Sequence, residues 1–380
     1  MFRSSHSRRV LKRSLRVLAG AVVALALLTA VTPHGRAGYK AALFVTQVIP
    51  PVPSVSLFQP DSTRERITFQ SPEGPRDADI YRPEGDGPYA AVVLFLGVAP
   101  AGPDDPRLVN LGNALARSGM VTMVYWSPDK LDGRIHPPDV HNLVAAYEHL
   151  QSRPYVDEDR VGFGGFCVGA SFSLMAAAQP EINSEVAFVN AFGPYYDLER
   201  LLLDYGTRTR VTDSGDPHWE IDKLTRRVAR TMLLDELPSE EADQVAHALD
   251  TGSQPPDGLS EEARAAYRIL AGGTEPQVRA AAEALPASAH ELFRAASPSH
   301  VLDQVKAPVS LMHDRGDDLV PAHHSRLTAE ALREHGAKVR HTEFSLFEHV
   351  DPSASLGPIE TASEVWKFFT HLYGIMRIAT

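Results

Sequence analysis

The chain has a single cysteine, Cys167, among its 380 residues. One thiol cannot form an intrachain disulfide framework, and it cannot supply the several thiolates of a cysteine-built zinc site. The sequence also lacks a glycine-rich phosphate loop, a Walker-type pattern, a dinucleotide fingerprint and an internal repeat. These absences predict a protein without a nucleotide, metal or other cofactor, and they leave one thiol whose role needs an explanation.

Positive charge is scarce beyond the first 16 residues. The formal net charge is −11, and residues 1–16 carry six Lys or Arg and no acid, so the rest of the chain carries −17. A net negative charge of this size repels the phosphates of a nucleic acid, so nucleic acid is not an expected partner. Hydrophobic residues make up 43% and charged residues 22% of the chain, close to globular averages, so a fibrous or wholly disordered chain is excluded as well.

The amino terminus has the order that export machinery recognises, basic residues followed by an apolar stretch. The apolar stretch runs from Val17 to Val31. Its length suits a signal peptide, and tilt would extend it toward the roughly 20 residues of a membrane span. Gly35-Arg-Ala37 offers a weak cleavage site. We therefore assign residues 1–38 to a signal or hydrophobic anchor helix, with a buried helix of the folded domain as the alternative. The remainder is expected outside the cytoplasm, membrane-anchored if the leader is kept and secreted if it is cleaved.

Proline is frequent in the segment that follows. Val48-Ile-Pro-Pro-Val-Pro-Ser54 and then Gln59-Pro60 interrupt any long helical pattern. Repeated proline favours an extended chain, because the ring fixes φ and removes a backbone donor. Residues 39–65 are therefore expected to form a stalk.

From Arg66 onward, short strand-like runs alternate with helix-length segments, the pattern of a doubly wound, mostly parallel α/β sheet. Residues 67–70 and 78–82 predict an opening hairpin, and Ala90–Leu96 is apolar on both faces, like a central parallel strand. Further strands are expected at 121–126, 160–164, 187–190, 308–313 and 339–342, and a closing helix at 359–373. The core is expected to comprise residues 66–197 and 297–380.

Residues 198–296 have almost no strand signal. They contain four charged helical stretches, at 223–234, 239–248, 260–270 and 275–285. Ser239-Glu-Glu-Ala and Ser260-Glu-Glu-Ala have the form of helix-starting capping patterns. The segment is expected to be a helical cap inserted into the core, with a disordered insert as the alternative.

The lone cysteine lies where a strand is expected to turn directly into a helix. Its setting is Gly165-Phe-Cys-Val-Gly169, with glycines two residues before and two residues after the thiol. Glycines at these positions let the backbone turn sharply and expose the middle side chain, and the start of the following helix stabilises negative charge there. The pattern indicates a nucleophile elbow, with an inert buried thiol as the alternative.

This elbow resembles that of the α/β-hydrolase superfamily and, within it, the dienelactone hydrolase family, in which Cys follows a Gly-aromatic pair. A second likeness is Ala307-Pro-Val-Ser-Leu-Met-His-Asp-Arg-Gly-Asp-Asp-Leu-Val-Pro321, which is similar to the family's strand and His-Gly-x-x-Asp-x-x-Val-Pro motif, with Asp314 in place of glycine. A third is Phe347-Glu-His349, which matches the loop that carries the family's histidine. The resemblance covers roughly residues 66–197 and 297–373.

The resemblance implies that Cys167 is the nucleophile, Asp317 the acid and His349 the base. The order nucleophile, acid, histidine along the chain supports this assignment independently. Asp314 and Asp318 compete with Asp317, and His341 competes with His349. The register of the motif favours Asp317.

An anion formed during the reaction needs two backbone donors. The first expected donor is the N–H of Val168, directly after the nucleophile, and the second lies in the loop after the strand at 90–96, at Gly97 or Val98. We assign the oxyanion hole to Val168 and Val98, and substrate binding to Gly97 and Tyr195.

These residue types predict a hydrolase that cleaves a carboxylic ester, a lactone or a thioester through a thioacyl-enzyme intermediate. Residues 95–99 lack the glutamate that the family places near its resting cysteine, and arginines for a substrate carboxylate are not matched. A non-catalytic, membrane-tethered binding protein on a hydrolase fold and an acyltransferase with the same three residues therefore stay open. The expected partners are a small ester or lactone and, if the leader is kept, a membrane; no pattern indicates an oligomeric state.

Two further motifs invite a functional interpretation. His323 and His324 are adjacent, but neighbouring helical residues point apart, so we expect them on the surface and not as a metal pair. Ser171 lies four residues past Cys167, inside the expected helix, and is not expected to act as a nucleophile.

Overall fold

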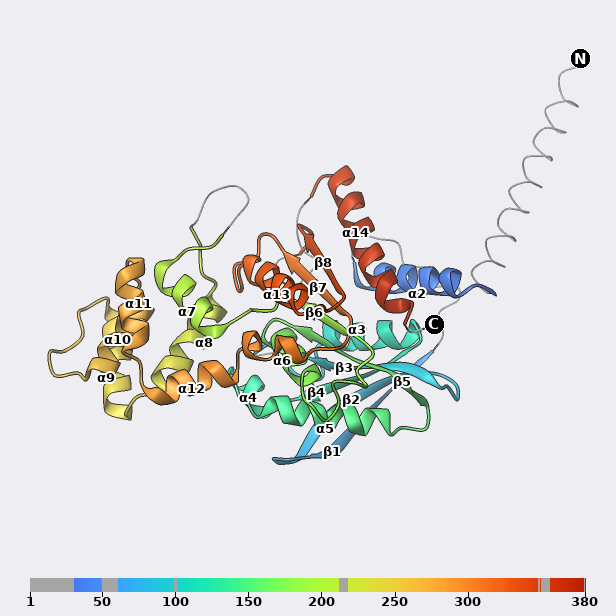
Figure 1. The fold of residues 1–380 in the computed structure, drawn as a ribbon, viewed down its shortest axis with the longest axis horizontal. Helices are drawn as coiled ribbons and strands as arrows, with labels where there is room; N and C mark the ends of the chain where they lie inside the picture. Colours follow the sequence, from blue (N-terminus) through green and yellow to red (C-terminus); the bar gives the residue numbers. More distant parts are fainter. Residues whose placement is uncertain are drawn as a thin grey trace, which may run out of the picture.

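The computed structural model of the protein describes residues 31–49, 61–98, 101–211, 218–347, 349, 356–378 and 380. Eight strands form one sheet in the order β1-β2-β4-β3-β5-β6-β7-β8 (Figure 1). β1 (Ser62–Ser71) and β2 (Gly74–Pro83) form the expected hairpin, and β2 is antiparallel to β4 (Met120–Trp126). All remaining neighbours are parallel, which confirms the mostly parallel α/β sheet.

The chain changes direction across the sheet at β3. It runs from β3 (Tyr89–Phe95) to β4 on one side, and then returns past β3 to β5 (Val156–Phe166) on the other. β6 (Val189–Phe192), β7 (Val309–Asp314) and β8 (Val339–Phe344) extend the sheet from there. Ligands of open α/β sheets bind at such a switch point, outside the carboxyl ends of the strands.

Helices cover both faces of the sheet, as its apolar strands require. On β3, Ala91 and Val93 pack with α5 (Asp139–Gln151) and α6 (Val168–Ala177), whereas Ala90 and Val92 pack with helices on the opposite face. That opposite face carries α2 (Pro33–Val48), α3 (Pro106–Arg117) and α14 (Pro358–Met376). The remaining core elements are α4 (Pro128–Leu131), α13 (His323–Glu334) and the 3-10 turns η2 (Pro298–His300) and η3 (Leu302–Gln304).

The stalk expected at 39–65 differs from the structure at both of its ends. Residues 39–48 belong to α2, which buries Ala41 and Phe44 against the cluster that includes α14. Residues 62–65 belong to β1. The prolines that suggested an extended chain lie between residues 50 and 60, and Thr32 caps the helix before them by accepting a hydrogen bond from Gly35 N–H. Residues 50–60 lie outside the described part of the chain, as do the basic and apolar residues 1–30.

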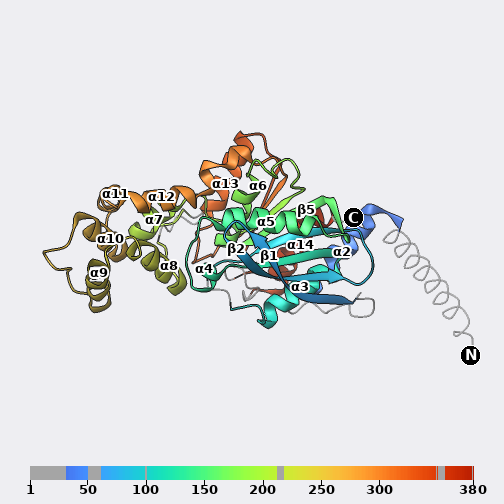
Figure 2. The ribbon, with the colours of Figure 1, turned by 90° about the horizontal axis from the view of Figure 1, so that it is seen from below.

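In the described parts of the insertion between β6 and β7, six helices form a lobe beside one end of the sheet (Figures 1 and 2). They are α7 (Leu198–Thr207), α8 (Lys223–Leu234), α9 (Ser239–Thr251), α10 (Glu261–Ala271), α11 (Glu275–Glu283) and α12 (Ala287–Ala295). We call this lobe the cap.

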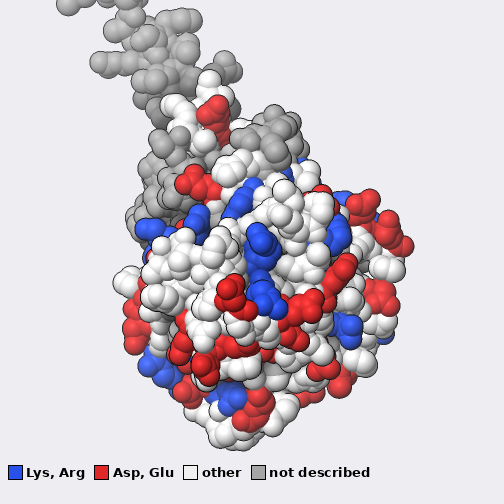
Figure 3. All heavy atoms as spheres, turned by 90° about the vertical axis from the view of Figure 1, so that its left-hand side faces the viewer, with Lys and Arg blue, Asp and Glu red and all other residues white. Residues whose placement is uncertain are grey.

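Ser260 caps α10 as its pattern predicts, by accepting a hydrogen bond from Ala263 N–H, whereas Ser239 lies one residue inside α9. The end of the cap that faces away from the sheet carries interspersed acidic and basic side chains (Figure 3). The cap is therefore ordered helix with a polar exterior, and its apolar residues join the main core cluster. Among the described residues, no helix combines the length and the apolar character needed to cross a membrane.

Two helical glycines should respond oppositely to the same substitution. A Cβ at Gly38 in α2 meets nothing within 4 Å, whereas one at Gly112 in α3 would lie 2.6 Å from ring carbons of Tyr81. Gly38→Ala should raise the free energy of unfolding by about 0.5–1 kcal/mol, because alanine loses less backbone entropy in a helix. Gly112→Ala should lower it by about 1–3 kcal/mol through overpacking. Urea denaturation of both variants measures the difference, and two shifts of the same sign would contradict the described packing.

Candidate active site

Cys167 occupies the sharp turn between β5 and α6. Its φ and ψ are 55° and −127°, a conformation that side-chain-bearing residues rarely adopt. Its N–H donates to the carbonyl of Phe192 at 2.8 Å, which ties the turn to the end of β6. The thiol belongs to a residue that is 8% exposed and lines a cavity. The structure thus holds Cys167 in the strained elbow that the glycine pattern predicts.

The glycines around Cys167 are required by close packing. A Cβ at Gly165 would lie 2.3 Å from the carbonyl oxygen of Gly169, and one at Gly169 would lie 2.2 Å from that of Phe95. At Gly97, a Cβ would come within 2.9 Å of the Cβ of Cys167. The elbow therefore fits between β3 and the start of α6 only because these positions have no side chain.

His349 and Asp317 come together beside Cys167, although 32 residues separate them in sequence. The Nδ1 atom of His349 lies 2.6 Å from Oδ2 of Asp317. The other carboxylate oxygen, Oδ1, accepts hydrogen bonds from the backbone N–H groups of Leu319 and Val320 at 2.8 and 2.9 Å. Because Nδ1 faces the carboxylate, the opposite edge of the ring is left for Cys167, whose charge acts on His349.

The charges of the two residues depend on each other. Burial works to raise the pKa of Asp317, but the charge of His349 and hydrogen bonds from His313 and His349 hold it well below its usual range. Burial works to lower the pKa of His349, but the charges of Asp317 and Cys167, with hydrogen bonds to both, raise it well above its usual value. The arrangement favours an imidazolium held between a carboxylate and the cysteine.

The three residues that compete with Asp317 and His349 for the acid and base roles have other partners. They are Asp314, Asp318 and His341. Asp318 pairs with Arg210 at 3.0 Å, and Nε2 of His341 lies 2.9 Å from Oγ of Ser325. Asp314 accepts hydrogen bonds from Phe347 N–H at 2.9 Å and Gly316 N–H at 2.8 Å, and burial raises its pKa to about 6. Asp314 therefore ties the end of β7 to the loop that carries His349. This role was not evident from its position in the motif.

The other predicted site residues surround the same cavity. Val98, Val168 and Tyr195 line it, whereas Gly97 lies against Cys167, where a Cβ would stand 3.6 Å from Sγ. Val168 is the first residue of α6, so its N–H belongs to the first turn, whose amides have no partner within the helix. Tyr195 is fully buried, and its hydroxyl donates to the carbonyl of Ala296 at 2.6 Å, so it contributes its ring to the cavity wall.

A buried lysine near the elbow was not identified from the sequence. The ammonium of Lys130, in α4, lies 4.0 Å from the ring centre of Phe172 and 4.8 Å from that of Phe95. Within the described part of the chain its Nζ atom has no hydrogen-bond partner, and burial lowers the pKa of Lys130 to about 8 against the charges of Asp139 and Cys167. Its surroundings depend on α4, β3 and α6 together, so no local motif signals it.

His323 and His324 are buried, and the expectation that they lie on the surface is wrong. Both Nε2 atoms reach Oδ2 of Asp204 in α7, at 2.8 and 3.2 Å. The two rings lie 4.6 Å apart at the amino end of α13, so the adjacent side chains converge on one carboxylate. Together they form a buried link, the Asp204 clamp, between the cap and the core.

The Asp204 clamp has the ligand spacing of a metal site, since its three ligand atoms lie within 4.8 Å of one another. The hydrogen bonds to the Nδ1 atoms of His323 and His324 favour two neutral histidines that donate to Asp204, and not a metal site. The backbone N–H of Val211 donates to Nδ1 of His323, and that of Tyr196 donates to Nδ1 of His324. Each Nδ1 is therefore unprotonated, each Nε2 carries the proton, and both rings donate to Asp204. A neutral histidine that binds a metal through Nε2 carries its proton on Nδ1. In the clamp, each Nδ1–H would then point at a backbone N–H, and two donors would face each other, so the geometry does not favour a metal.

Comparison with known proteins connects this geometry to a family. Residues 129–200, which include the elbow, match the model of the Dienelactone hydrolase family. No curated protein sequence matches the chain.

Among solved structures, a Bacteroides ovatus protein provisionally named a dipeptidyl aminopeptidase IV is 13% identical with a TM-score of 0.50, over 83% of this chain and 36% of that chain. An acylaminoacyl peptidase from Pyrococcus horikoshii is 15% identical with a TM-score of 0.47, over 82% and 40%. A Pyrobaculum calidifontis esterase is 14% identical with a TM-score of 0.47, over 93% and 94%. The chain thus spans about two fifths of the length of the peptidases that it matches.

The mixed sheet, the strained elbow and the likeness to a solved structure are those of the α/β-hydrolase fold. Within that fold, the match of residues 129–200 to the Dienelactone hydrolase family model agrees with the resemblance drawn from the motif around Cys167.

The Asp204 clamp should make stability depend on pH. Burial lowers the pKa of His324 to about 4, whereas an unfolded histidine titrates near 6.5. Between these values the unfolded state binds the extra proton, so stability falls as the pH falls from about 6.5 to 4. The pKa of Asp204, about 2, extends the loss below pH 4 in the same direction, because unfolded aspartate protonates first.

His324→Gln should remove up to about 1.4 kcal/mol per pH unit from the slope of unfolding free energy in this window. Urea denaturation at several pH values measures the slope. Buried His341 and His371 titrate in both proteins, so the difference isolates His324. The matched control is His247→Gln on the exposed side of α9, which should leave the slope unchanged. A slope unaffected by His324→Gln would contradict the assigned protonation.

Proposed function

We propose that the protein hydrolyses carboxylic esters, lactones or thioesters with Cys167 as nucleophile, His349 as base and Asp317 as the acid that orients His349. The observation that carries the proposal is the 2.6 Å contact between His349 Nδ1 and Asp317, in a chain whose cysteine is held at a positive φ. A cysteine with a purely structural role has no need of this conformation or of these neighbours.

The proposed reaction begins with the thiol proton held by His349, which the raised pKa of His349 favours. The sulfur then attacks the ester carbonyl, the bond between carbon and the leaving oxygen breaks, and the proton on His349 passes to the departing alcohol. Water, deprotonated by His349, attacks the resulting thioester. The carbon–sulfur bond breaks, the thiol is restored, and the acid is released. Each turnover consumes one ester and one water.

Two backbone N–H groups are proposed to stabilise the anion formed at each attack. Val168 supplies the first from the start of α6, where the aligned peptide dipoles favour negative charge. Val98, in the loop after β3, lines the same cavity and supplies the second N–H. Asp314 supports the site indirectly, because its bond to Phe347 N–H positions the chain two residues before His349.

We also propose that the folded part is exported. The basic residues before Val17 and the apolar stretch that follows support this location. In that location, an ester met outside the cytoplasm would be the substrate.

Three substitutions test the proposed chemistry. Cys167→Ala, His349→Ala and Asp317→Asn should each lower kcat for p-nitrophenyl esters by about 10³-fold or more, because the three residues act as a unit. His247→Ala, on the exposed side of α9, is the matched control and should retain activity.

Mass spectrometry after incubation with a p-nitrophenyl ester should show one acyl group on Cys167, accumulating most in His349→Ala if deacylation is slowed more than acylation. Turnover that survives Cys167→Ala would exclude the proposed nucleophile. Turnover in wild type without any acylated Cys167, in quenched samples taken before the steady state, would favour direct attack by water.

A further inference from the structure

The cavity beside Cys167 extends away from the sheet into the cap. Its wall includes one side of α7, with Leu198, Leu201, Leu202 and Tyr205, a spacing that places four residues on one helical face. An apolar face of α8 contributes most of the opposite wall, with Leu224, Val228, Ala229 and Met232. The two cap helices thus direct apolar faces into one space. The empty volume is about 590 Å³, including the mouth.

The wall of this space is uncharged. None of its lining residues is an Asp, Glu, Lys, Arg or His. Two of its polar groups already have partners: the hydroxyl of Thr225 donates to the carbonyl of Leu319 at 3.0 Å, and that of Tyr195 donates to Ala296. A carboxylate buried here would lose its hydration without gaining a cation, which is strongly unfavourable. The space therefore suits a hydrocarbon group.

The charges of α8 lie outside the cavity wall. Arg226, Arg227 and Arg230 line a separate surface depression, and Arg230 pairs with Asp250 of α9 at 2.8 Å. α8 is thus amphipathic, with leucine, valine and methionine toward the cavity and arginine away from it. The same helix thus offers Met232 as a position at which to alter the cavity wall and Arg227 as a control position outside the wall.

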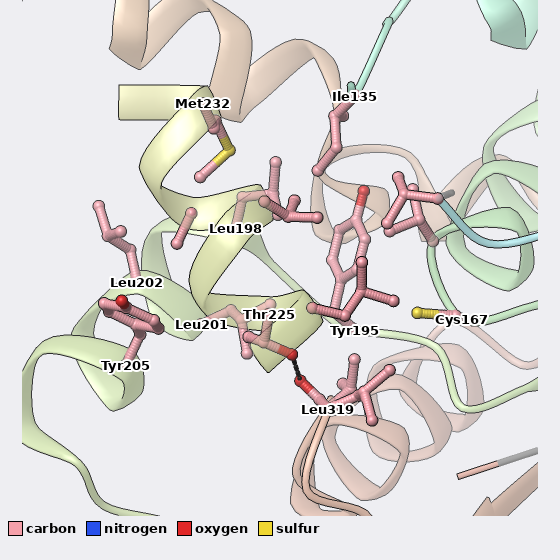
Figure 4. Close-up of a pocket in the computed structure, with 16 residues that line it drawn as sticks. Ile135, Cys167, Tyr195, Leu198, Leu201, Leu202, Tyr205, Thr225, Met232 and Leu319 are labelled. Carbon is pink, nitrogen blue, oxygen red and sulfur yellow. Dashed lines mark hydrogen bonds between the residues drawn. The ribbon is translucent and has the colours of Figure 1, made fainter. Parts of the chain in front are cut away.

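The cavity is elongated, with the thiol at one end. Figure 4 shows Cys167 at one side of the view, then Tyr195 and Leu198, and then Leu202, Tyr205 and Met232 at the other side. We propose that this space is an acyl-chain site, in which an unbranched aliphatic chain extends from the carbonyl carbon at Cys167 between α7 and α8 toward Met232. This inference rests on the proposed function and adds its substrate class: esters of aliphatic acids of medium length.

A series of p-nitrophenyl esters from acetate to palmitate measures the acyl-chain site. Each methylene buried against the wall should raise kcat/KM by about three- to fourfold, until the chain reaches the far end. Met232→Trp should fill that end, so that the preferred chain becomes shorter. The control, Arg227→Trp on the exposed side of the same helix, should leave the preference unaltered. Equal kcat/KM for acetate and octanoate esters would overturn the acyl-chain site and leave the thiol chemistry standing.

Binding without chemistry separates the two proposals. Cys167→Ala cannot form a thioacyl enzyme but keeps the cavity, so calorimetry should detect binding of 1-octanol to this variant. Adding Met232→Trp to Cys167→Ala should weaken that binding tenfold or more, whereas adding Arg227→Trp should not. Octanol binding with this response, together with a wild type that hydrolyses no ester, would support the acyl-chain site and overturn the proposed function. Absence of octanol binding by folded Cys167→Ala would overturn the acyl-chain site.

Discussion

The buried carboxylate of Asp317 connects the parts of the molecule that must meet at Cys167. A charge so deep in the protein is tolerable only when its oxygens are fully occupied. One oxygen is held by the backbone of Leu319 and Val320, and the other by His349, with His313 at 3.3 Å. The acid loop and the histidine loop are therefore joined through one group, and a change in either loop leaves a buried charge without its partners.

The same acid loop is attached to the cap. The carbonyl of Asp318 accepts hydrogen bonds from the indole N–H of Trp219 and the backbone N–H of Asp222, and the carbonyl of Leu319 accepts one from Thr225. Behind it, the Asp204 clamp joins α7 to α13. The cap is thus anchored one and two residues from Asp317. A lid that swung away from the core would break these bonds, so the structure favours a fixed cap that shapes the cavity.

The sequence was most informative where the determining interactions are local. The apolar run at 90–96 indicates β3, the periodicity at 223–234 indicates α8, and the glycine frame around Cys167 indicates the elbow, because each depends on neighbouring residues. The Asp204 clamp joins residues 119 and 120 positions apart, and Lys130 is buried by elements distant in sequence. α2 was mistaken in part for stalk, since nearby prolines outweighed an apolar face whose packing partner, α14, lies at the other end of the chain.

Helix α2 also bears on how the leader would be processed. The small-x-small site at Gly35-Arg-Ala37 lies within the first turns of α2, and Ala37 is fully buried. A peptidase that cut after Ala37 would remove Pro33 and the capping hydroxyl of Thr32, and it would place a new charged terminus at Gly38, next to a buried position. The site would have to be cut before α2 packs against α3 and α14. In the folded protein, the bond after Ala37 lies within α2 and is protected from cleavage.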